Sequence, residues 1–422
     1  MSDIHFKYGD SELEASLPDS WRVKKLLPIG LPPADDPAAA VRDALENPID
    51  SPPLTEVLTG AKDLVITVSD KTRVTRIDAV LPHILAIAND AGVPDESITI
   101  IMACGTHAGH TGEERAAIVG PDVAARIRLL DHDCNAADLV NVGTTSAGTP
   151  IAINRLAHEA DRLVVTGCAQ FHYFAGFGGG RKGVLPGICA EKTIIANHSH
   201  TIAESGGRNP LCTTGKLDGN PLSEDMAEAT RLAAPDFLVN TVLTSDREIA
   251  AVFAGHWEQA HRAACEEVTK HFAVPIDGKA DIVIASPGGY PKDINYIQSH
   301  KAYDNAYQAV KPGGTIILTA ECRDGLGSPI LRKWLGVPTT EEHEQGLRDH
   351  FQITGHTALA HRLKAESVRT IMLSDMDDEE LGLLRVERAK DLQQAVDMAA
   401  NKVDSDAPSV YIMPNGYATL PG

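Results

Sequence analysis

Short apolar runs rich in β-branched residues alternate with longer amphipathic stretches along most of this 422-residue chain. The runs lack polar–apolar alternation and therefore predict strands that are covered on both faces. They are residues 63–68, 97–103, 127–130, 161–166, 281–285, 315–319, 369–373 and 408–413. Helices are predicted at residues 76–91, 111–126, 221–233, 255–272, 294–310, 340–351 and 387–401. Because strands that alternate with helices form βαβ units, the predicted fold class is α/β with largely parallel sheets.

Two breaks in this pattern bear on the domain organisation. Residues 204–220 are rich in glycine and asparagine and predict a long loop. Residues 273–280 carry Pro275 and Gly278 between a predicted helix and a fresh strand. We place the domain boundary there, which divides the chain into two α/β domains, residues 1–272 and 273–422.

Charge and cysteine usage exclude several classes of protein. The chain has 38 Lys+Arg against 58 Asp+Glu, a net charge of −20, which argues against a nucleic-acid partner. Its seven dispersed cysteines form no C-x-x-C pair, as expected of reduced thiols in a cytoplasmic protein. The polar, acidic residues 1–15 do not resemble a signal peptide, and no apolar run is long enough to predict a membrane span.

Polar clusters directly follow four of the predicted strands. They are residues 69–73, residues 104–107, residues 172–180 and residues 287–293. Ligands of open parallel sheets bind at the carboxyl ends of the strands. Three clusters belong to the first domain and one opens the second, so we expect an active site in the cleft between the two domains.

The densest cluster lies within residues 171–187, FHYFAGFGGGRKGVLPG. Its glycines permit close approach of a ligand, and Arg181 and Lys182 follow them as an anion-binding pair. The order Gly-Arg-Lys-Gly differs from the Gly-Lys-Ser/Thr of a Walker A loop. A flexible surface loop is the alternative, but the aromatic residues Phe171, Tyr173 and Phe174 favour a packed structure.

The chain has 17 histidines, of which His107, His172 and His198 lie in or beside these clusters. A single histidine is more often a hydrogen-bonded structural residue than a catalytic one. In the second domain, Gln298 and Lys301 share a face of the predicted helix, since they are three residues apart. An amide beside an ammonium suits a carboxylate or a hydroxyl-rich ligand, although a solvated helix face is equally compatible.

Taken in order, these motifs resemble those of the nickel-pincer-nucleotide-dependent lactate racemase family. The family's Ser-Asp-x-Thr-Arg, Gly-x-His and Asn-His correspond to residues 69–73, 105–107 and 197–198. Its long His-aromatic-Phe-Ala-Gly-Phe-x-Gly-Gly-Arg-Lys motif corresponds to residues 172–182 without a gap. Its Gly-Gly-x-Pro-x-Asp and Gln-x-x-Lys correspond to residues 288–293 and 298–301. The resemblance runs from about Asp35 into the C-terminal domain.

The resemblance implies a role for each matching residue. Lys182 would be joined through a thioamide to the nickel-pincer nucleotide, Ni(II) pyridinium-3-thioamide-5-thiocarboxylate mononucleotide, and His198 would bind its nickel. His107 and His172 would be the acid/base pair, and Arg73, Gln298 and Lys301 would hold the substrate carboxylate. The other cofactor-binding residues would be Asp70, Thr72, Arg73, Gly179, Gly180, Arg181, Gly288, Gly289, Pro291 and Asp293.

The implied activity is that of a racemase or epimerase that inverts C2 of a 2-hydroxy acid by proton-coupled hydride transfer to the cofactor. Two histidines suit this chemistry, because the hydroxyl of each enantiomer needs its own proton acceptor near neutral pH. Separate proteins make and load the cofactor in the family, so a preparation from another host can lack it. The sequence leaves the oligomeric state open, a homo-oligomer included.

The chain departs from the usual lactate racemase pattern near the implied pocket. Gly178 replaces a serine, Tyr173 a phenylalanine and Val74 a proline, and Ala108-Gly109-His110 stands where Arg-Pro commonly follows the histidine. No implied catalytic group is lost. The polar Tyr173 and His110 suit a larger acid, which leaves lactate, malate, a sugar acid and other 2-hydroxy acids open as substrates.

Two other functions remain open from the sequence. His107, His110 and His198 could hold zinc in a metallohydrolase, although no H-E-x-x-H motif supports this. The glycine-rich loop and its basic residues would also suit a non-catalytic protein that binds a nucleotide or a sugar phosphate.

Overall fold

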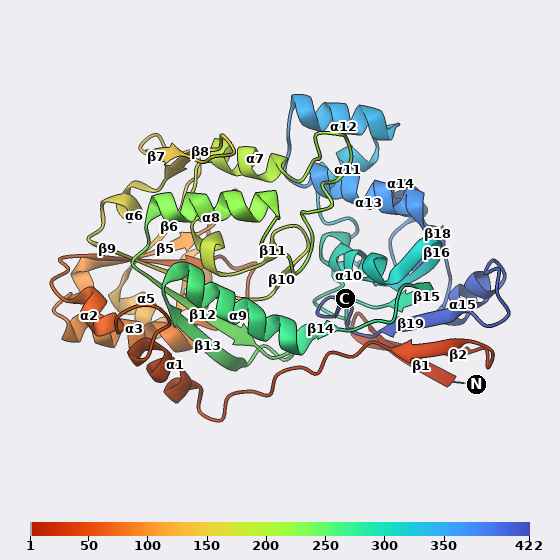
Figure 1. Cartoon of the computed structure of the whole chain (residues 1–422), viewed down its shortest axis with the longest axis horizontal. Coiled ribbons are helices and arrows are strands. Elements are labelled where there is room, and N and C mark those ends of the chain that lie inside the picture. Colours follow the sequence, from red (N-terminus) through yellow and green to blue (C-terminus); the bar gives the residue numbers. More distant parts are fainter. Residues whose placement is uncertain (1) are drawn as a thin grey trace. The chain divides into compact units, whose positions relative to one another are not determined.

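The computed structural model describes residues 2–422, which form two compact units (Figure 1). Unit 2 contains Gly30–His200 and Leu211–His271. Unit 1 contains the residues up to Ile29, Thr201–Pro210 and Phe272–Gly422. The last segment of unit 1 begins at Phe272, one residue before the boundary that we placed at residue 273. Unit 1 also takes in the N-terminal residues and the segment 201–210, which the division into 1–272 and 273–422 assigned to the other domain.

A six-stranded sheet in the order β13-β12-β9-β4-β5-β6 forms the centre of unit 2. Its strands are β4 (Leu64–Ser69), β5 (Ile98–Ala103), β6 (Arg128–Asp131), β9 (Arg162–Cys168), β12 (Phe237–Leu243) and β13 (Ile249–Gly255). All neighbours pair in parallel except β13, which is antiparallel to β12. The predicted strands 63–68, 97–103, 127–130 and 161–166 are therefore confirmed, whereas the sequence analysis missed β12 and β13.

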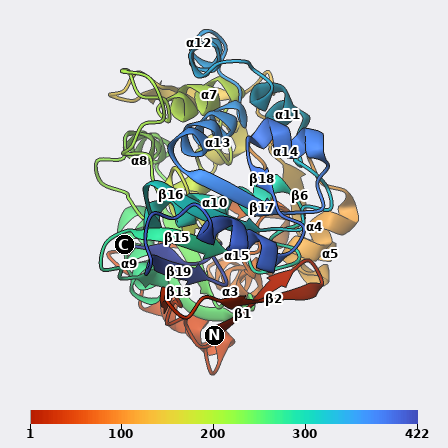
Figure 2. The same ribbon diagram turned by 90° about the vertical axis from the view of Figure 1, so that its right-hand side faces the viewer.

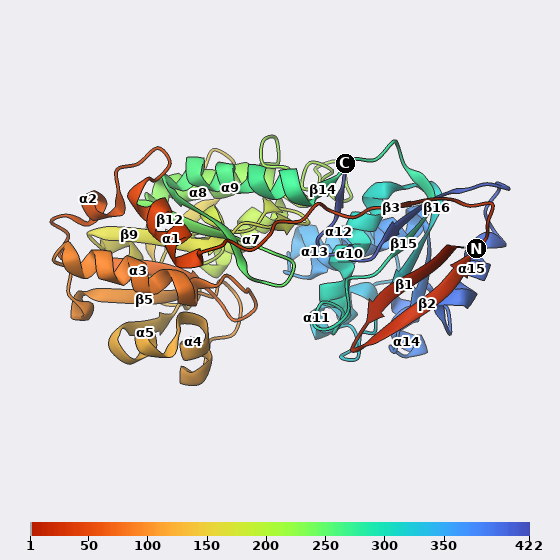
Figure 3. The same ribbon diagram turned by 90° about the horizontal axis from the view of Figure 1, so that it is seen from below.

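Helices cover both faces of this sheet, as the continuous apolar runs predict (Figure 3). An apolar core joins one face to α1, α2, α3, α4 and α5. These are Pro37–Glu46, Leu54–Leu58, Ile77–Asp90, Gly112–Val119 and Pro121–Arg126. The short helix η2 (Gly180–Gly183) packs on the other face, where Gly183 lies against Val165. Helices α8 (Pro221–Ala233) and α9 (Trp257–Phe272) cover η2, with Thr230 of α8 and His261 of α9 bonded to Arg181.

The remaining elements of unit 2 are short. The hairpin β7 (Val140–Thr144) and β8 (Pro150–Ile153) precedes α6 (Arg155–Glu159). A second hairpin, β10 (Phe171–His172) and β11 (Gly176–Phe177), precedes α7 (Glu191–Ser199). The predicted helix 111–126 is interrupted, because Gly120 has a φ of +90° and Pro121 begins a new helix.

Unit 1 has an entirely parallel six-stranded sheet in the order β18-β17-β16-β15-β19-β3. Its strands are β3 (Arg22–Lys25), β15 (Ala280–Ala285), β16 (Val310–Thr319), β17 (Arg369–Leu373), β18 (Glu387–Arg388) and β19 (Ser409–Met413). The four strands predicted here are confirmed. The edge strand β3 comes from the N-terminus, which explains why the residues up to Ile29 belong to unit 1. A small parallel pair, β14 (Ala273–Val274) and β20 (Leu420–Pro421), lies near the C-terminus.

The two faces of this sheet are covered differently. One apolar core packs α10 (Tyr296–Ala309), α11 (Pro329–Leu335), α12 (Thr340–Asp349), α13 (Gly355–Ser367) and α14 (Asp378–Leu384) on one face. The other face is covered by α15 (Leu392–Ala400) and the hairpin β1 (Ser2–Tyr8) and β2 (Ser11–Leu17), which lie together in Figure 2. The predicted helix 387–401 begins only at Leu392, because residues 387–388 form β18.

The predicted loop 204–220 is confirmed, since no helix or named strand of the described chain lies within it. Part of it is fastened to unit 1, where Arg208 donates to the buried Asp304 over 2.6 Å. None of the helices in residues 2–422 combines the length and the apolar character that a bilayer crossing requires.

Candidate functional site

Three of the four polar clusters emerge at one edge of unit 2. β9, β4 and β5 are adjacent and parallel, so residues 169–172, 70–73 and 104–107 follow neighbouring strand ends. The sheet therefore brings together side chains that are up to about 100 positions apart in the sequence. The fourth cluster follows β15 in unit 1.

Asp70 and His107 form a hydrogen-bonded pair at this edge. Nδ1 of His107 donates to Oδ2 of Asp70 over 2.7 Å, and Thr72 donates to Oδ1 through its backbone N–H and its hydroxyl. Burial would raise the pKa of Asp70, but the bonds from His107 and Thr72 outweigh it and lower the pKa to about 2. Asp70 is therefore a carboxylate that holds the proton of His107 on Nδ1. The half-exposed His107 ring is left with the lone pair of its Nε2.

His172 has the opposite tautomer. The backbone N–H of Ala175 donates to Nδ1 of His172 over 3.3 Å, which places the proton of the neutral ring on Nε2. The ring stacks on Tyr173 at 5.3 Å between centroids and meets Phe174 edge-on at 4.4 Å. The two predicted acid/base histidines thus differ, because Nε2 is an acceptor in His107 and a donor in His172.

The Phe174 ring is the common neighbour of Lys182 and His198. Nζ of Lys182 lies 5.7 Å from the centroid of this buried ring, and the centroid of the His198 ring lies 5.4 Å from it. Burial, together with the positive charges of Arg73 and Arg181, lowers the pKa of Lys182 to about 7. Much of the Lys182 amine is therefore neutral near pH 7, and the neutral amine is the nucleophilic form.

His198 lies in the last turn of α7 and is buried. Its Nδ1–H donates to the carbonyl oxygen of Ile194, one turn earlier, over 2.9 Å. The adjacent Asn197 donates to Asp225 of α8 over 2.8 Å and fixes this end of α7. Because Nδ1 carries the proton, the lone pair of His198 is on Nε2, the arrangement typical of a metal-binding histidine.

The side chains of the basic pair Arg181 and Lys182 have different surroundings. The Arg181 guanidinium is buried in unit 2, where it donates to Ser223 over 2.8 Å, to the carbonyl oxygen of Ala175 over 3.2 Å and to Nδ1 of His261 over 3.1 Å. Arg181 therefore anchors η2 to α8 and α9, while Lys182 lies beside Phe174.

The glycines that precede this pair are required by contacts within the protein. Gly179 and Gly180 have φ values of +70° and +51°. A Cβ on Gly179 would lie 2.6 Å from Oδ1 of Asn240, and one on Gly180 would collide with the ring of His261. The run of glycines thus lets the loop pack closely against α9 and β12.

In unit 1, the loop Gly288–Asp293 is docked onto the turn between β1 and β2. The buried Asp293 accepts from the backbone N–H of Gly9 over 2.7 Å, and the N–H of Tyr290 donates to the carbonyl oxygen of Gly9 over 2.9 Å. Gly289 has a φ of +73°, and a Cβ there would lie 2.8 Å from Cβ of Lys7. Gly288, Gly289 and Asp293 therefore fix the path of the loop, which includes Pro291.

Gln298 and Lys301 meet on α10 as their spacing predicts. Nζ of Lys301 donates to Oε1 of Gln298 over 2.9 Å and to the hydroxyl of Tyr417 over 3.2 Å. The N-cap residue Asn295 accepts from the backbone N–H of Gln298 and fixes the start of the helix. The ammonium and the amide thus form one polar group.

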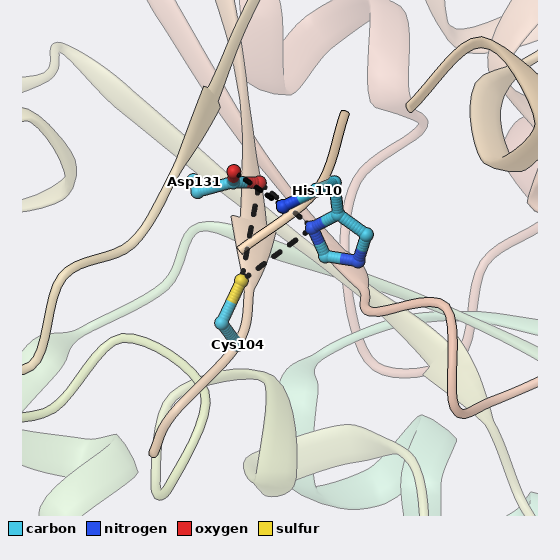
Figure 4. Close-up of side chains that lie close together, drawn as sticks. All are labelled: Cys104, His110 and Asp131. Carbon is cyan, nitrogen blue, oxygen red and sulfur yellow. Dashed lines mark hydrogen bonds and ion pairs between the residues drawn. The ribbon is translucent and has the colours of Figure 1, made fainter. Parts of the chain in front are cut away.

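Cys104, His110 and Asp131 form a second polar cluster, at the ends of β5 and β6 (Figure 4). In residues 2–422, it is the only group of three or more His, Cys, Asp or Glu side chains close enough to share a metal ion. Nδ1 of His110 donates to Asp131 over 2.8 Å, and its Nε2 accepts from the backbone N–H of Lys71 over 3.0 Å. Since both ring nitrogens are used, His110 has no lone pair left for a metal.

The other two members of this cluster support the same conclusion. Asp131 forms an ion pair with Arg115 over 2.7 Å, and burial raises the pKa of Cys104 to about 12, so its thiol stays protonated. The cluster is therefore a hydrogen-bond network that ties Lys71 to β6. It does not include His107 or His198, so the zinc set His107, His110 and His198 is not assembled.

The sequence analysis did not predict the contacts that Phe174 and Tyr417 make with the candidate site residues. Phe174 was predicted to pack, but its contacts with Lys182 of η2 and His198 of α7 depend on how these two helices pack around it. Tyr417 had no local signal, since it lies 116 positions from Lys301.

Comparisons with known proteins agree along the whole chain. The lactate racemase N-terminal domain matches residues 8–209, and the lactate racemase C-terminal domain matches residues 276–420. A lactate racemase of Thermoanaerobacterium thermosaccharolyticum is 34% identical over 442 aligned positions, which cover 100% of this chain and 99% of the relative. A lactate racemase of Lactiplantibacillus plantarum is 34% identical over 395 positions, covering 90% of each chain.

A solved structure supports the same relationship. The lactate racemase apoprotein from Thermoanaerobacterium thermosaccharolyticum superposes with a TM-score of 0.90 at 34% identity and covers 100% of both chains. Identity of this level over the full length, together with matches to both domains, is decisive. The chain belongs to the lactate racemase family of isomerases.

Proposed function

We propose that this protein inverts C2 of a 2-hydroxy acid with a nickel-pincer nucleotide attached covalently to Lys182. The single observation that carries the proposal is the group around Phe174, where the amine of Lys182 and the ring of His198 share one buried neighbour. The relatives are lactate racemases, and lactate is the first substrate to test.

The residues present fit the cofactor chemically. Covalent attachment needs a nucleophilic amine, and the lowered pKa of Lys182 provides one near neutral pH. Nickel binding needs an imidazole lone pair, which the bond from Nδ1 of His198 to Ile194 leaves on Nε2. Arg73 contributes positive charge beside Lys182, which suits a phosphate-bearing group. By their match to the family's motifs, we also assign Asp70, Thr72, Gly179, Gly180, Gly288, Gly289, Pro291 and Asp293 to cofactor binding. Arg181 would hold η2 in place through its bonds to α8 and α9.

When bound, the cofactor supplies nickel and the acceptor for the hydride that leaves C2. The protein's own residues move the hydroxyl proton. We assign the hydroxyl proton of one enantiomer to Nε2 of His107, whose imidazolium the Asp70 carboxylate stabilises. We assign the hydroxyl proton of the other enantiomer to His172, which would give it to the keto oxygen from the imidazolium form on return. Inversion in both directions needs one neutral ring as the base and one imidazolium as the acid, and the two histidines would exchange these roles.

Arg73, Gln298 and Lys301 would bind the substrate carboxylate. All three offer N–H donors, and two of them are cations. Lys301 and Gln298 are already oriented toward each other in unit 1.

His110 does not contribute to the choice of substrate acid. Its side chain is fully enclosed, and both its nitrogens bond within the protein, so it offers nothing to a substrate. Tyr173, which stacks on His172, is left as the polar departure that would favour a larger acid such as malate or a sugar acid. Measuring racemisation of a panel of 2-hydroxy acids by loaded protein would decide, with the highest kcat/KM identifying the substrate.

Intact mass tests the cofactor assignment. Protein produced together with the cofactor-synthesis and loading proteins should carry an adduct of several hundred daltons that Lys182→Ala abolishes. Lys192→Ala is the matched control, because Lys192 is an exposed lysine on α7. An adduct that persists in Lys182→Ala would refute the assignment. None of the seven cysteines of the described chain is in a disulfide, which supports our proposal that the enzyme works in the cytoplasm.

A further inference from the structure

The C-terminal turn, residues 414–419, packs tightly against unit 1. The backbone N–H of Gly416 donates to the carbonyl oxygen of Ser286 over 2.7 Å, and Nδ2 of the buried Asn305 donates to the carbonyl oxygen of Gly416 over 2.8 Å. A Cβ on Gly416 would lie 3.1 Å from Cβ of Ala302. The turn is therefore held between the end of β15 and α10.

Tyr417 meets Lys301 in two ways from this turn. Its hydroxyl oxygen lies 3.2 Å from Nζ of Lys301, and the centroid of its ring lies 4.8 Å from the same nitrogen. The contact combines a charge-assisted hydrogen bond with a cation–π interaction. Since Gln298 accepts from the same ammonium, Lys301 is held between a helix neighbour and the C-terminal turn.

The turn also reaches the second segment of unit 1 that the proposed function uses. Oδ1 of Asn415 accepts from Nζ of Lys292 over 3.2 Å, and Lys292 lies in the loop Gly288–Asp293. One short turn thus contacts both the loop and the Gln298–Lys301 pair.

We propose that Tyr417 is a positioning residue that sets the Lys301 ammonium for the carboxylate of the substrate. This inference rests on the proposed function. A lysine side chain has many rotamers, so an ammonium that is held in place before binding loses less conformational freedom on binding. The carboxylate does not react, so Tyr417 acts on KM and leaves kcat nearly unchanged.

Two variants and one control test this role in loaded enzyme. Tyr417→Phe keeps the ring and removes the hydroxyl, and we expect it to raise KM about three- to tenfold with kcat within about twofold. Tyr417→Leu also removes the ring and should raise KM further. Tyr307→Phe is the matched control: Tyr307 lies on α10, bonds to Ser367 through its hydroxyl and also lies near two lysines. It should leave KM unchanged.

A double-mutant cycle separates positioning from general stability. In a Lys301→Met background, Tyr417→Phe should no longer change kcat/KM, because the group that it orients is gone. Melting temperatures of all variants report their folding. The role of Tyr417 is overturned if neither substitution raises KM, or if the loss is equally large in the Lys301→Met background. A loaded wild-type enzyme that racemises no 2-hydroxy acid overturns the proposed function itself, and this role with it.

Discussion

Oδ2 of Asp70 lies 2.7 Å from Nδ1 of His107, so the ends of two neighbouring strands, β4 and β5, are joined through one charged hydrogen bond. A second bond, from the backbone N–H of Lys71 to Nε2 of His110, joins the same two loops over 3.0 Å. The orientation of His107 therefore depends on tertiary contacts as well as on its own loop.

Asp70→Asn should separate charge from shape. The amide nearly matches the carboxylate in size but cannot stabilise a protonated His107, so we expect kcat to fall about 100-fold or more and KM to change less than about threefold. Racemisation by loaded enzyme, followed by chiral chromatography, measures both. Asp246→Asn, at an exposed loop position, is the control. An unchanged kcat would remove Asp70 from the proposed proton transfer.

Lys182→Met should stabilise the unloaded protein in a pH-dependent way. The pKa of Lys182 is about 7 in the folded chain and near 10.5 ordinarily. Between these two pH values the amine is protonated in the unfolded chain and neutral in the folded chain. The resulting cost to folding grows as pH falls to about 7 and is constant below that. Methionine removes the cost, and the free energy of unfolding at pH 6–7 should rise by up to about 5 kcal/mol, since one pKa unit corresponds to about 1.4 kcal/mol.

The control for this experiment is the exposed Lys192. Denaturant unfolding at pH 6, 7, 8 and 9 should show the advantage of Lys182→Met shrinking as pH rises, and no such trend for Lys192→Met. An advantage that is the same at every pH would mean that Lys182 has an ordinary pKa.

His198→Ala should weaken nickel binding without preventing the covalent attachment of the cofactor to Lys182. The Lys182 adduct should persist in the intact mass, whereas nickel per chain should fall at least about tenfold, since loss of even an outer partner of a ligand weakens metal binding 10–100-fold. Elemental analysis of desalted, loaded protein measures nickel. His158→Ala, at an exposed position of α6, is the control. Full nickel occupancy in His198→Ala would contradict the assigned ligand.

The Cys104, His110 and Asp131 cluster should behave as a hydrogen-bond network. His110→Ala leaves the Lys71 N–H and the Asp131 carboxylate each without one partner and should cost about 2–3 kcal/mol in the free energy of unfolding. Cys104→Ala should cost about 1 kcal/mol, because its sulfur lies 3.8 Å from His110 and 4.0 Å from Asp131.

Adding zinc tests whether this cluster binds a metal ion instead. Added Zn²⁺ should not raise the melting temperature of the unloaded protein. A rise that either His110→Ala or Cys104→Ala abolishes would instead identify a metal site.

The sequence predicted elements well where one physical pattern dominated. The apolar runs 63–68 and 97–103 became the buried strands β4 and β5, because a strand covered on both faces needs no polar side. Helix α13 (Gly355–Ser367) was missed for a related reason. It is buried nearly all round, with His356, His361 and Arg362 inside, so it has no amphipathic pattern.

Contacts between distant segments were beyond the reach of the sequence pattern. The N-terminal strand β3 joins the sheet of unit 1 next to β19, almost 400 positions away, and the Gly9 turn holds Asp293. A strand edge accepts any neighbour of suitable register, so local composition does not reveal which segment pairs there.

By itself, the sequence determined the α/β class, the order of the motifs and the residue types available for chemistry. Tertiary structure decided how neighbouring residues are used. Arg181 and Lys182 are adjacent and both basic, yet one is bonded inside unit 2 and the other lies beside Phe174 with a lowered pKa. The reason is physical: charge and hydrogen-bonding capacity belong to the residue, whereas burial and partners are set by the segments that fold around it.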